Sequence, residues 1–306
     1  MKLSDYQTAA LATDQTPVPH GMGSDAARLI PLLGLAGEAG QLLSEFKKRL
    51  RDGPSHVEFV DHVAEELGDI LWYLANTASK YGLDLDAVAA ANLKKVQALY
   101  GKPQSRSGYD ATFQEHERFP RQFIVAFREI REGDRVEVRT EIDGKLIGSA
   151  LTDNAYEDDG YRFHDIFHVA FAAILGWSPI LRSLLRLKRR SQPLVDEVED
   201  GGRAAVIEEG IVAVAFDYGR RHNFLTGVSD VDEQLLSTLM GMSAHLEVAA
   251  QPPSLWRQAV LDGFEVWRQL VQNGGGRVLA DLDRSEIRYL GSLETAIATA
   301  AAAPSE

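Results

Sequence analysis

The chain has 306 residues, of which 45% are hydrophobic and 25% are charged, and its formal net charge at pH 7 is −13. This balance is typical of a globular protein of about two domains, and the negative charge argues against a nucleic-acid polymer as partner. The absence of cysteine excludes disulfides, thiolate metal sites and a cysteine nucleophile. Because neither a signal peptide nor an apolar run long enough to span a bilayer is visible, we expect a cytoplasmic protein with no membrane partner.

The first hundred or so residues follow a helical pattern in four segments. A short helix is expected near the N-terminus, and a long one runs from about Asp25 to Gly53. A third helix ends at Gly82 and a fourth at Gly101. Because the connections are short, residues 1–102 are expected to form a four-helix domain.

The pattern changes after this domain. Residues 103–118 are polar and without periodicity, which predicts a linker. Alternating Val and Ile residues at about 122–152, with Asp143-Gly144 between two runs, predict a β-hairpin. Helical patterning then resumes, so we expect residues 119–306 to form an α-helical C-terminal domain that includes the hairpin. The fold class is therefore predicted to be mainly α, with two helical domains and one small β element.

Acidic residues recur at helical spacing on the second and third predicted helices. GLAGEAGQLLSEF places Glu38, Gln41 and Glu45 on one face, and EELGD places Glu66 and Asp69 on one face. If these helices pack antiparallel, the two faces meet beside leucines, where clustered carboxylates are costly unless a cation compensates. Mg²⁺, or Mn²⁺, prefers such oxygen ligands, so all five side chains are candidate metal ligands. The alternative is a solvated acidic face.

The segments GLAGEAGQL, EELGDILWYLA and ANLKKVQALYG occur in that order, and together they resemble the MazG-like, all-α nucleoside triphosphate pyrophosphohydrolases. This resemblance covers about the first third of the chain. It implies Mg²⁺-dependent hydrolysis of a canonical or modified (d)NTP to the (d)NMP and pyrophosphate, within a homo-oligomer that is a dimer or a tetramer. It further implies that Glu38, Glu66 and Asp69 are catalytic metal ligands and that Asn92 and Lys95 bind the substrate.

Gln41 is the position at which the chain departs from the pattern of that family, which has ExxE on one helix and ExxD on the next. A glutamine oxygen can ligate Mg²⁺ but brings no negative charge, so the cluster should hold a cation less tightly. This leaves a second function open, that of a catalytically weakened nucleotide-sensing or interaction module.

A second group of candidate ligands lies in the C-terminal half. YRFHDIFHVAF contains His164, Asp165 and His168, whose two histidines are four residues apart on one helical face, and VIEEGI adds Glu208 and Glu209. Two imidazoles and a carboxylate are suited to a transition metal, so these residues form a candidate second site with separate metal-hydrolase chemistry. The alternative is a pair of histidines bonded to buried carboxylates or backbone. The region also resembles a C-terminal domain that accompanies some MazG-like proteins.

The C-terminal half also contains the one dense basic run of this acidic chain, SLLRLKRRSQ. It could bind phosphate or an acidic partner surface. Such a run is more often the solvated end of a helix, which is the alternative interpretation.

Overall fold

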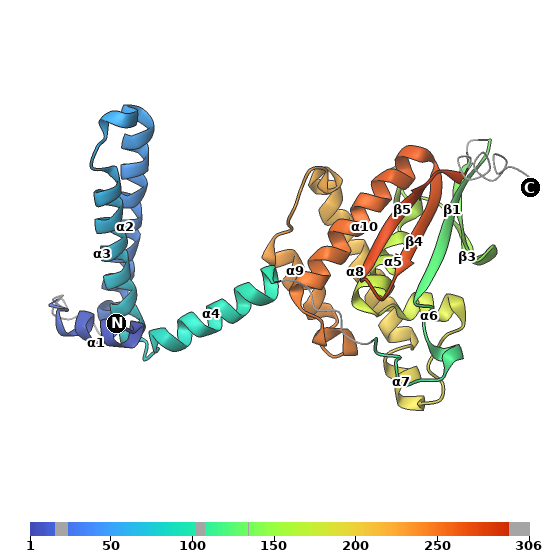
Figure 1. The fold of residues 1–306 in the computed structure, drawn as a ribbon, viewed down its shortest axis with the longest axis horizontal. Coiled ribbons are helices and arrows are strands. Elements are labelled where there is room, and N and C mark those ends of the chain that lie inside the picture. The colour runs from blue at the N-terminus through green and yellow to red at the C-terminus, as the bar shows by residue number, and fades with distance from the viewer. Residues whose placement is uncertain (16–23, 102–107, 134, 294–306) are drawn as a thin grey trace, which may run out of the picture. The chain divides into compact units, whose positions relative to one another are not determined.

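A computed structural model describes residues 1–15, 24–101, 108–133 and 135–293 (Figure 1). The chain divides into two compact units, Met1–Gln97 and Ala98–Glu306. The sequence placed the end of the first domain a few residues later, after residue 102. Each unit is described separately below.

The first unit is helical, as predicted. Its long helices α2 and α3 pack against each other as an antiparallel pair, joined by a short 3₁₀ turn, and α1 packs on α3. A small apolar core holds Ala10, Ala75, Ala78 and the first residue of α4, Leu85. The bounds are α1 Leu3–Ala12, α2 Ser24–Asp52, α3 Phe59–Lys80 and α4 Leu85–Tyr100, of which the residues after Gln97 belong to the second unit.

The close approach of α2 and α3 depends on Gly34. A Cβ atom at this position would lie 2.2 Å from a ring carbon of Tyr73 on α3, so only a residue without a side chain lets the ring pack there. Gly37 and Gly40, which follow on the same helix, have open space at their Cβ positions. Gly34 therefore sets the separation of the two helices about one turn before Glu38.

The second unit contains a five-stranded antiparallel sheet with the order β3-β2-β1-β4-β5. The predicted hairpin is present as β2 and β3, and Asp143 and Gly144 take the positive φ angles of its turn, 49° and 73°. The prediction was incomplete, because the central strand β1 pairs with β2 on one side and with β4 on the other. The strands are β1 Gln122–Glu132, β2 Arg135–Ile142, β3 Lys145–Leu151, β4 Gly275–Asp281 and β5 Glu286–Gly291.

Helices complete the core of this unit. The short helix α5 lies at its centre against α10 and α8, and α10 also packs along β4 and β5 (Figure 1). Phe163, Phe167 and Phe171 are fully buried there. The described helices are α5 Asp165–Ala170, a π-helical segment Phe171–Leu175, α6 Pro179–Leu185, α7 Pro193–Val198, α8 Gly202–Arg221, α9 Glu233–Met242 and α10 Pro253–Asn273.

Among the described residues, no single helix is long and apolar enough to cross a membrane. One pair, Tyr161–Leu175 with Pro179–Leu185, passes the same test of length and composition when taken together, although the two parts are bent by 103°. Most residues of this pair are buried inside the second unit, as expected for core helices.

The segment predicted as a linker contributes to the second unit wherever it is described. Phe113 is buried, and the buried Asp110 accepts hydrogen bonds from the Phe119 amide and from Nη2 of Arg182, each within 2.9 Å. Two of its polar side chains, Asp110 and Glu117, are buried, whereas most of its other described polar residues are exposed. The described part begins at residue 108, so residues 103–107 of the predicted linker lie outside it.

Two arginines of the basic run are also buried rather than exposed. Arg182 and Arg189 are each 1% exposed. The Arg189 guanidinium pairs with Asp200 and Glu247, with Nη2 at 2.7 Å from an oxygen of each. Helix α6 already ends at Leu185, so the interpretation as a solvated helix end is wrong for these two residues, and neither is free to bind phosphate.

Candidate functional site

Glu38, Glu66 and Asp69 come together where α2 packs on α3. One carboxylate oxygen of each residue lies within 4.8 Å of the others. Glu38 and Glu66 are partly buried, whereas Asp69 is exposed, so the acidic cluster opens to solvent on one side. The antiparallel pairing of the two helices places the acidic faces against each other, as the spacing in the sequence suggested.

The electrostatics of this acidic cluster favour a cation. Burial raises the pKa of Glu66, and the neighbouring carboxylates of Glu38 and Asp69 raise it further. The Oε2 atom of Glu66 is buried and has no hydrogen-bond partner in the described part of the chain. An orphaned carboxylate oxygen among other carboxylates fits a hard divalent cation such as Mg²⁺, which takes oxygen ligands.

Gln41 lies beside this cluster as a hydrogen-bond donor. Its Nε2 atom donates to Oε2 of Glu38 at 2.8 Å. A glutamate at this position would face Glu38 with a second carboxylate in place of that donor. Gln41 therefore holds one Glu38 oxygen in place and leaves the cluster with three negative charges.

Glu45 has different partners from those that the sequence suggested. Its Oε2 atom lies 2.9 Å from Nε2 of His56 and 3.1 Å from Nδ1 of His62, and its Oε1 atom accepts a hydrogen bond from Lys48. Lys48, followed by the two histidines, lowers the pKa of Glu45 to about 2. The structure therefore places Glu45 in a separate group, and the Lys48 ammonium already supplies a positive charge there.

The sequence analysis missed His56 and His62 as partners of Glu45. The only available signal was two histidines six residues apart near the start of the third helix. Asn92 and Lys95, in contrast, are both exposed on α4 and three residues apart, so they face the same side of that helix. Their contact with substrate stays a prediction.

The histidines of the second unit form a cluster with Glu209. Ligand atoms of His164, His168 and Glu209 lie within 4.8 Å of one another. Glu208, which was also a candidate ligand, is fully buried and is already satisfied, since it accepts hydrogen bonds from Ser178 Oγ at 2.6 Å and Ile180 N at 2.9 Å. It also lies 2.9 Å from Nδ1 of His168, so it orients that ring rather than facing the cluster.

The histidines and carboxylates of this second cluster change one another's pKa. Burial, the largest single effect, opposes protonation of His168, but the carboxylates of Glu208, Glu209 and Asp165 together outweigh it and raise the pKa of the imidazole to about 10. His168 in turn lowers the pKa of Glu209. The carboxylate of Asp165 accepts a hydrogen bond from Thr140 Oγ1 at 3.2 Å, and its other oxygen lies 3.7 Å from Nε2 of His164.

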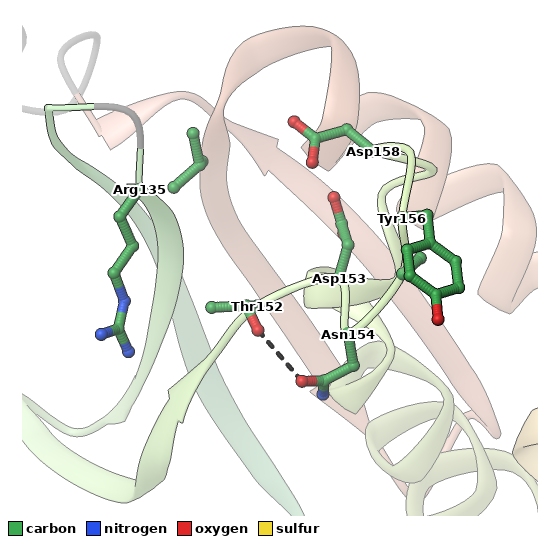
Figure 2. A pocket seen from close by; sticks show the side chains of 8 residues that line it. Arg135, Thr152, Asp153, Asn154, Tyr156 and Asp158 are labelled. Carbon is green, nitrogen blue, oxygen red and sulfur yellow. Dashed lines mark hydrogen bonds between the residues drawn. The ribbon is translucent and has the colours of Figure 1, made fainter.

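A separate hollow of about 500 Å³ lies beside the start of β2 and residues 152–158 (Figure 2). Thr152 donates a hydrogen bond to Asn154 within it, at 3.1 Å. The carboxylate of Asp153 is held by Arg162 at 2.6 Å. None of the site residues predicted from the sequence lines this hollow, so we assign it no chemistry.

Both parts of the chain match models of known protein families. Residues 30–99 match the MazG nucleotide pyrophosphohydrolase domain, and residues 104–292 match the MazG C-terminal domain. Among curated proteins, the Gene 37 protein of Mycobacterium phage L5 is 36% identical over 100 residues, which cover 32% of this chain and 88% of the phage protein. No solved structure matches the chain significantly.

Proposed function

Because this chain belongs to the MazG family, we propose that it is a Mg²⁺-dependent nucleoside triphosphate pyrophosphohydrolase that converts a (d)NTP to the (d)NMP and pyrophosphate. The observation that carries this proposal is the meeting of Glu38, Glu66 and Asp69, with one buried Glu66 oxygen that has no partner among the described residues. We place the reaction in the cytoplasm, as the sequence suggested.

In this proposal each residue of the acidic cluster has a defined task. Glu38, Glu66 and Asp69 would hold the ion, and Gln41 orients the Glu38 carboxylate through its hydrogen bond. A bound Mg²⁺ or Mn²⁺ would supply positive charge that offsets the charge of the phosphate oxygens. A carboxylate oxygen that is not on the ion orients the attacking water and accepts its proton. Asn92 and Lys95 on α4 would bind the sugar or phosphate oxygens.

The test is pyrophosphate release from a panel of NTPs and dNTPs with Mg²⁺ or Mn²⁺. We expect Asp69→Asn to lower kcat/KM by about a hundredfold or more, as loss of one electrostatic group at a reacting centre typically does. Glu65→Gln is the matched control, because Glu65 is an exposed acid on the same helix that lies outside the cluster. Its activity should stay near that of the native chain.

The second candidate function, a nucleotide-sensing or interaction module, rests on the missing charge at Gln41. Binding of nucleotide without any release of pyrophosphate, under every metal and substrate condition, would refute the enzyme and support the sensing module. A measured turnover that Asp69→Asn abolishes would exclude the sensing module as the whole function.

We also propose that the chain forms a homo-oligomer through the first unit. Large apolar side chains are exposed on α2 and α3, which is unusual for a helix pair that stays alone in water. They include Leu33, Leu43, Leu50, Val60 and Leu67. Sedimentation velocity should give two or four times the chain mass of 33.7 kDa. A monomer at micromolar concentration would contradict this.

A further inference from the structure

We propose that the second unit contains its own metal site, in which His164, His168 and Glu209 bind a divalent transition-metal ion. This site would be additional to the pyrophosphohydrolase function and does not depend on it. Nε2 of each histidine and a carboxylate oxygen of Glu209 are the ligand atoms. The inference rests on the orientation of the two rings, on one unpartnered nitrogen, on the distances between the ligand atoms and on the charge around them.

Both imidazole rings are held by their other nitrogen. Nδ1 of His164 lies 2.8 Å from the carbonyl oxygen of Tyr161, and Nδ1 of His168 lies 2.9 Å from Oε1 of Glu208. A carbonyl and a carboxylate only accept hydrogen bonds, so Nδ1 carries the proton in both rings and a neutral ring keeps its lone pair on Nε2. Metal-binding histidines are typically oriented in this way, by a carboxylate or a carbonyl behind the ring.

The Nε2 atom of His168 is the strongest single observation. His168 is 1% exposed, and this nitrogen is buried without a hydrogen-bond partner in the described part of the chain. It lies 3.6 Å from Oε1 of Glu209, which is too long for a good hydrogen bond. Two ligands that are each 2.0–2.2 Å from one tetrahedral ion lie about 3.5 Å apart. The observed separation of 3.6 Å matches that expected for two ligands of a shared ion.

The charge of the surroundings also fits a dication. The carboxylates of Asp165, Glu208 and Glu209 surround the two histidines. Within the described ranges, none of these three carboxylates forms an ion pair with a lysine or arginine. This contrasts with the Glu45 group, where Lys48 supplies a cation. Nitrogen ligands favour Zn²⁺, Fe²⁺ or Co²⁺ over Mg²⁺, which prefers oxygen alone.

The ligands lie on rigid elements with one open side. His168 is on the buried helix α5, which continues into the π-helical segment, a feature that is frequent at functional sites. Glu208 is held by Ser178 and by the first turn of α6, so the ring behind it is fixed. The Glu209 side chain is 49% exposed and opens the cluster to water. An ion could therefore enter there, and water or a substrate could fill its remaining positions.

The competing interpretation has no metal. In it, His168 is a charged imidazolium that bridges Glu208 and Glu209, and the cluster is a buried ion pair of purely structural value. If the cluster binds an ion, removal of Glu209 weakens metal binding; if it is only an ion pair, removal of Glu209 leaves metal binding by the chain unchanged. Because Glu209 is partly exposed, it can be replaced without opening the core.

The experiment is a Co²⁺ titration of the full chain, freed of metal by a chelator and carrying Asp69→Asn to weaken the acidic cluster of the first unit. Visible absorption should report one equivalent of Co²⁺ bound through nitrogen ligands, and metal analysis after gel filtration should find one equivalent of Zn²⁺. We expect His164→Gln and Glu209→Ala each to weaken Co²⁺ binding by about tenfold to a hundredfold or more. Unchanged circular dichroism would show that both variants remain folded.

His222→Gln is the matched control. Nδ1 of His222 lies 2.7 Å from the Tyr218 carbonyl oxygen, so this ring is held by a backbone carbonyl in the same way as the ring of His164. His222, however, belongs to no metal-ligating group within the described residues. Its Co²⁺ affinity should be unchanged. The proposal is overturned if the chain takes up no Co²⁺ at about 100 µM. It is also overturned if His62→Gln removes the bound ion while Glu209→Ala retains it, which would assign the ion to the Glu45 group.

Discussion

At the scale of single residues, Gln41 is the side chain on which the strength of the N-terminal acidic cluster depends. It gives Glu38 a hydrogen bond at the position where the ExxE pattern of the sequence analysis would place a second carboxylate. We predict that Gln41→Glu lowers the Mg²⁺ concentration needed for half-maximal pyrophosphate release by roughly threefold to tenfold, since a fourth carboxylate strengthens attraction for the cation. Measurement of the rate against Mg²⁺ concentration checks this.

Ala39→Glu is the control for this change, because it adds the same charge at an exposed position on a different face of α2. It should leave the Mg²⁺ dependence nearly unaltered. If both variants behave alike, the effect comes from net charge and not from the geometry of the cluster. If neither changes the metal requirement, Gln41 is no weakness in this site.

Glu45 gives a prediction about pH. Its lowered pKa means that its bonds to Lys48, His56 and His62 stabilise the folded unit above about pH 4.5, the unperturbed value, and that this stabilisation is lost as the pH falls toward 2. In a ¹³C NMR titration, Glu45 should therefore titrate near pH 2, well below its unperturbed value of 4.5. Because Lys48 is the largest cause, Lys48→Met should raise the pKa of Glu45, whereas Lys47→Met, at an exposed neighbour, should not. A native pKa near 4.5 would contradict this.

The sequence predicted the positions of residues best where the helical repeat decides which side chains share one face of a helix. Glu38, Glu66 and Asp69 could be found because their spacing places them on faces that two paired helices share. Glu208 and Glu209 could not be told apart, because adjacent residues on a helix point about 100° apart and only the packed structure shows which is buried. The contacts of Glu45 with Lys48 on the same helix, His56 in the connection and His62 on α3 could not be read from the acidic spacing, because the path of the chain between the two helices decides them.

At the scale of elements, the close contact between Gly34 and the Tyr73 ring connects the packing of α2 and α3 to the acidic cluster. We predict that Gly34→Ala pushes the Tyr73 ring away, separates the helices and weakens both Mg²⁺ binding and turnover by about tenfold, since small misplacements at a reacting centre are expensive. Isothermal calorimetry with Mg²⁺ and the pyrophosphate assay measure the two effects.

Gly37→Ala is the matched control for Gly34→Ala, because a Cβ atom at position 37 meets no described atom within 4 Å. It should keep metal binding and should stabilise the helix by about 1 kcal/mol, the ordinary gain of alanine over glycine. Equal behaviour of the two variants would mean that Tyr73 moves aside freely and that Gly34 does not set the helix separation.

The elements that the sequence missed are β4 and β5. The pattern RVLADLDRSEIRYLG contains alternation, but its turn lacks the Asn-Gly or Asp-Gly signal, and Ser285 takes the positive φ angle of 53° instead. A Cβ atom on Gly275 would lie 2.2 Å from the Phe127 carbonyl oxygen, so the absence of a side chain at Gly275 lets β4 approach β1.

At the scale of the whole molecule, buried arginines tie together distant parts of the second unit. Arg189 pairs with Asp200 and Glu247, and Arg182 with Asp110. We predict that Arg189→Met lowers the free energy of unfolding by about 3–5 kcal/mol, because it leaves two carboxylates without their buried partner. Denaturant unfolding followed by tryptophan fluorescence suits this test, since Trp177, Trp256 and Trp267 are buried in this unit.

Arg190→Met is the control, because Arg190 follows directly in the chain but is exposed. It should change the free energy of unfolding by less than about 0.5 kcal/mol. Arg189→Lys should not restore stability, since an ammonium cannot bond both carboxylates in the fork geometry of a guanidinium. A small effect of Arg189→Met would show that the unit repacks around the loss.

The order of the strands has a consequence for synthesis of the chain. The central strand β1 is made early, but its neighbour β4 follows more than a hundred residues later. While the ribosome synthesises the helices between them, one edge of β1 has no partner strand. An unpaired strand edge can pair with other chains. The first unit, whose contacts are local, can fold as soon as it emerges. The second must wait for β4, so its nascent form is the stage at which we expect chaperones to matter most.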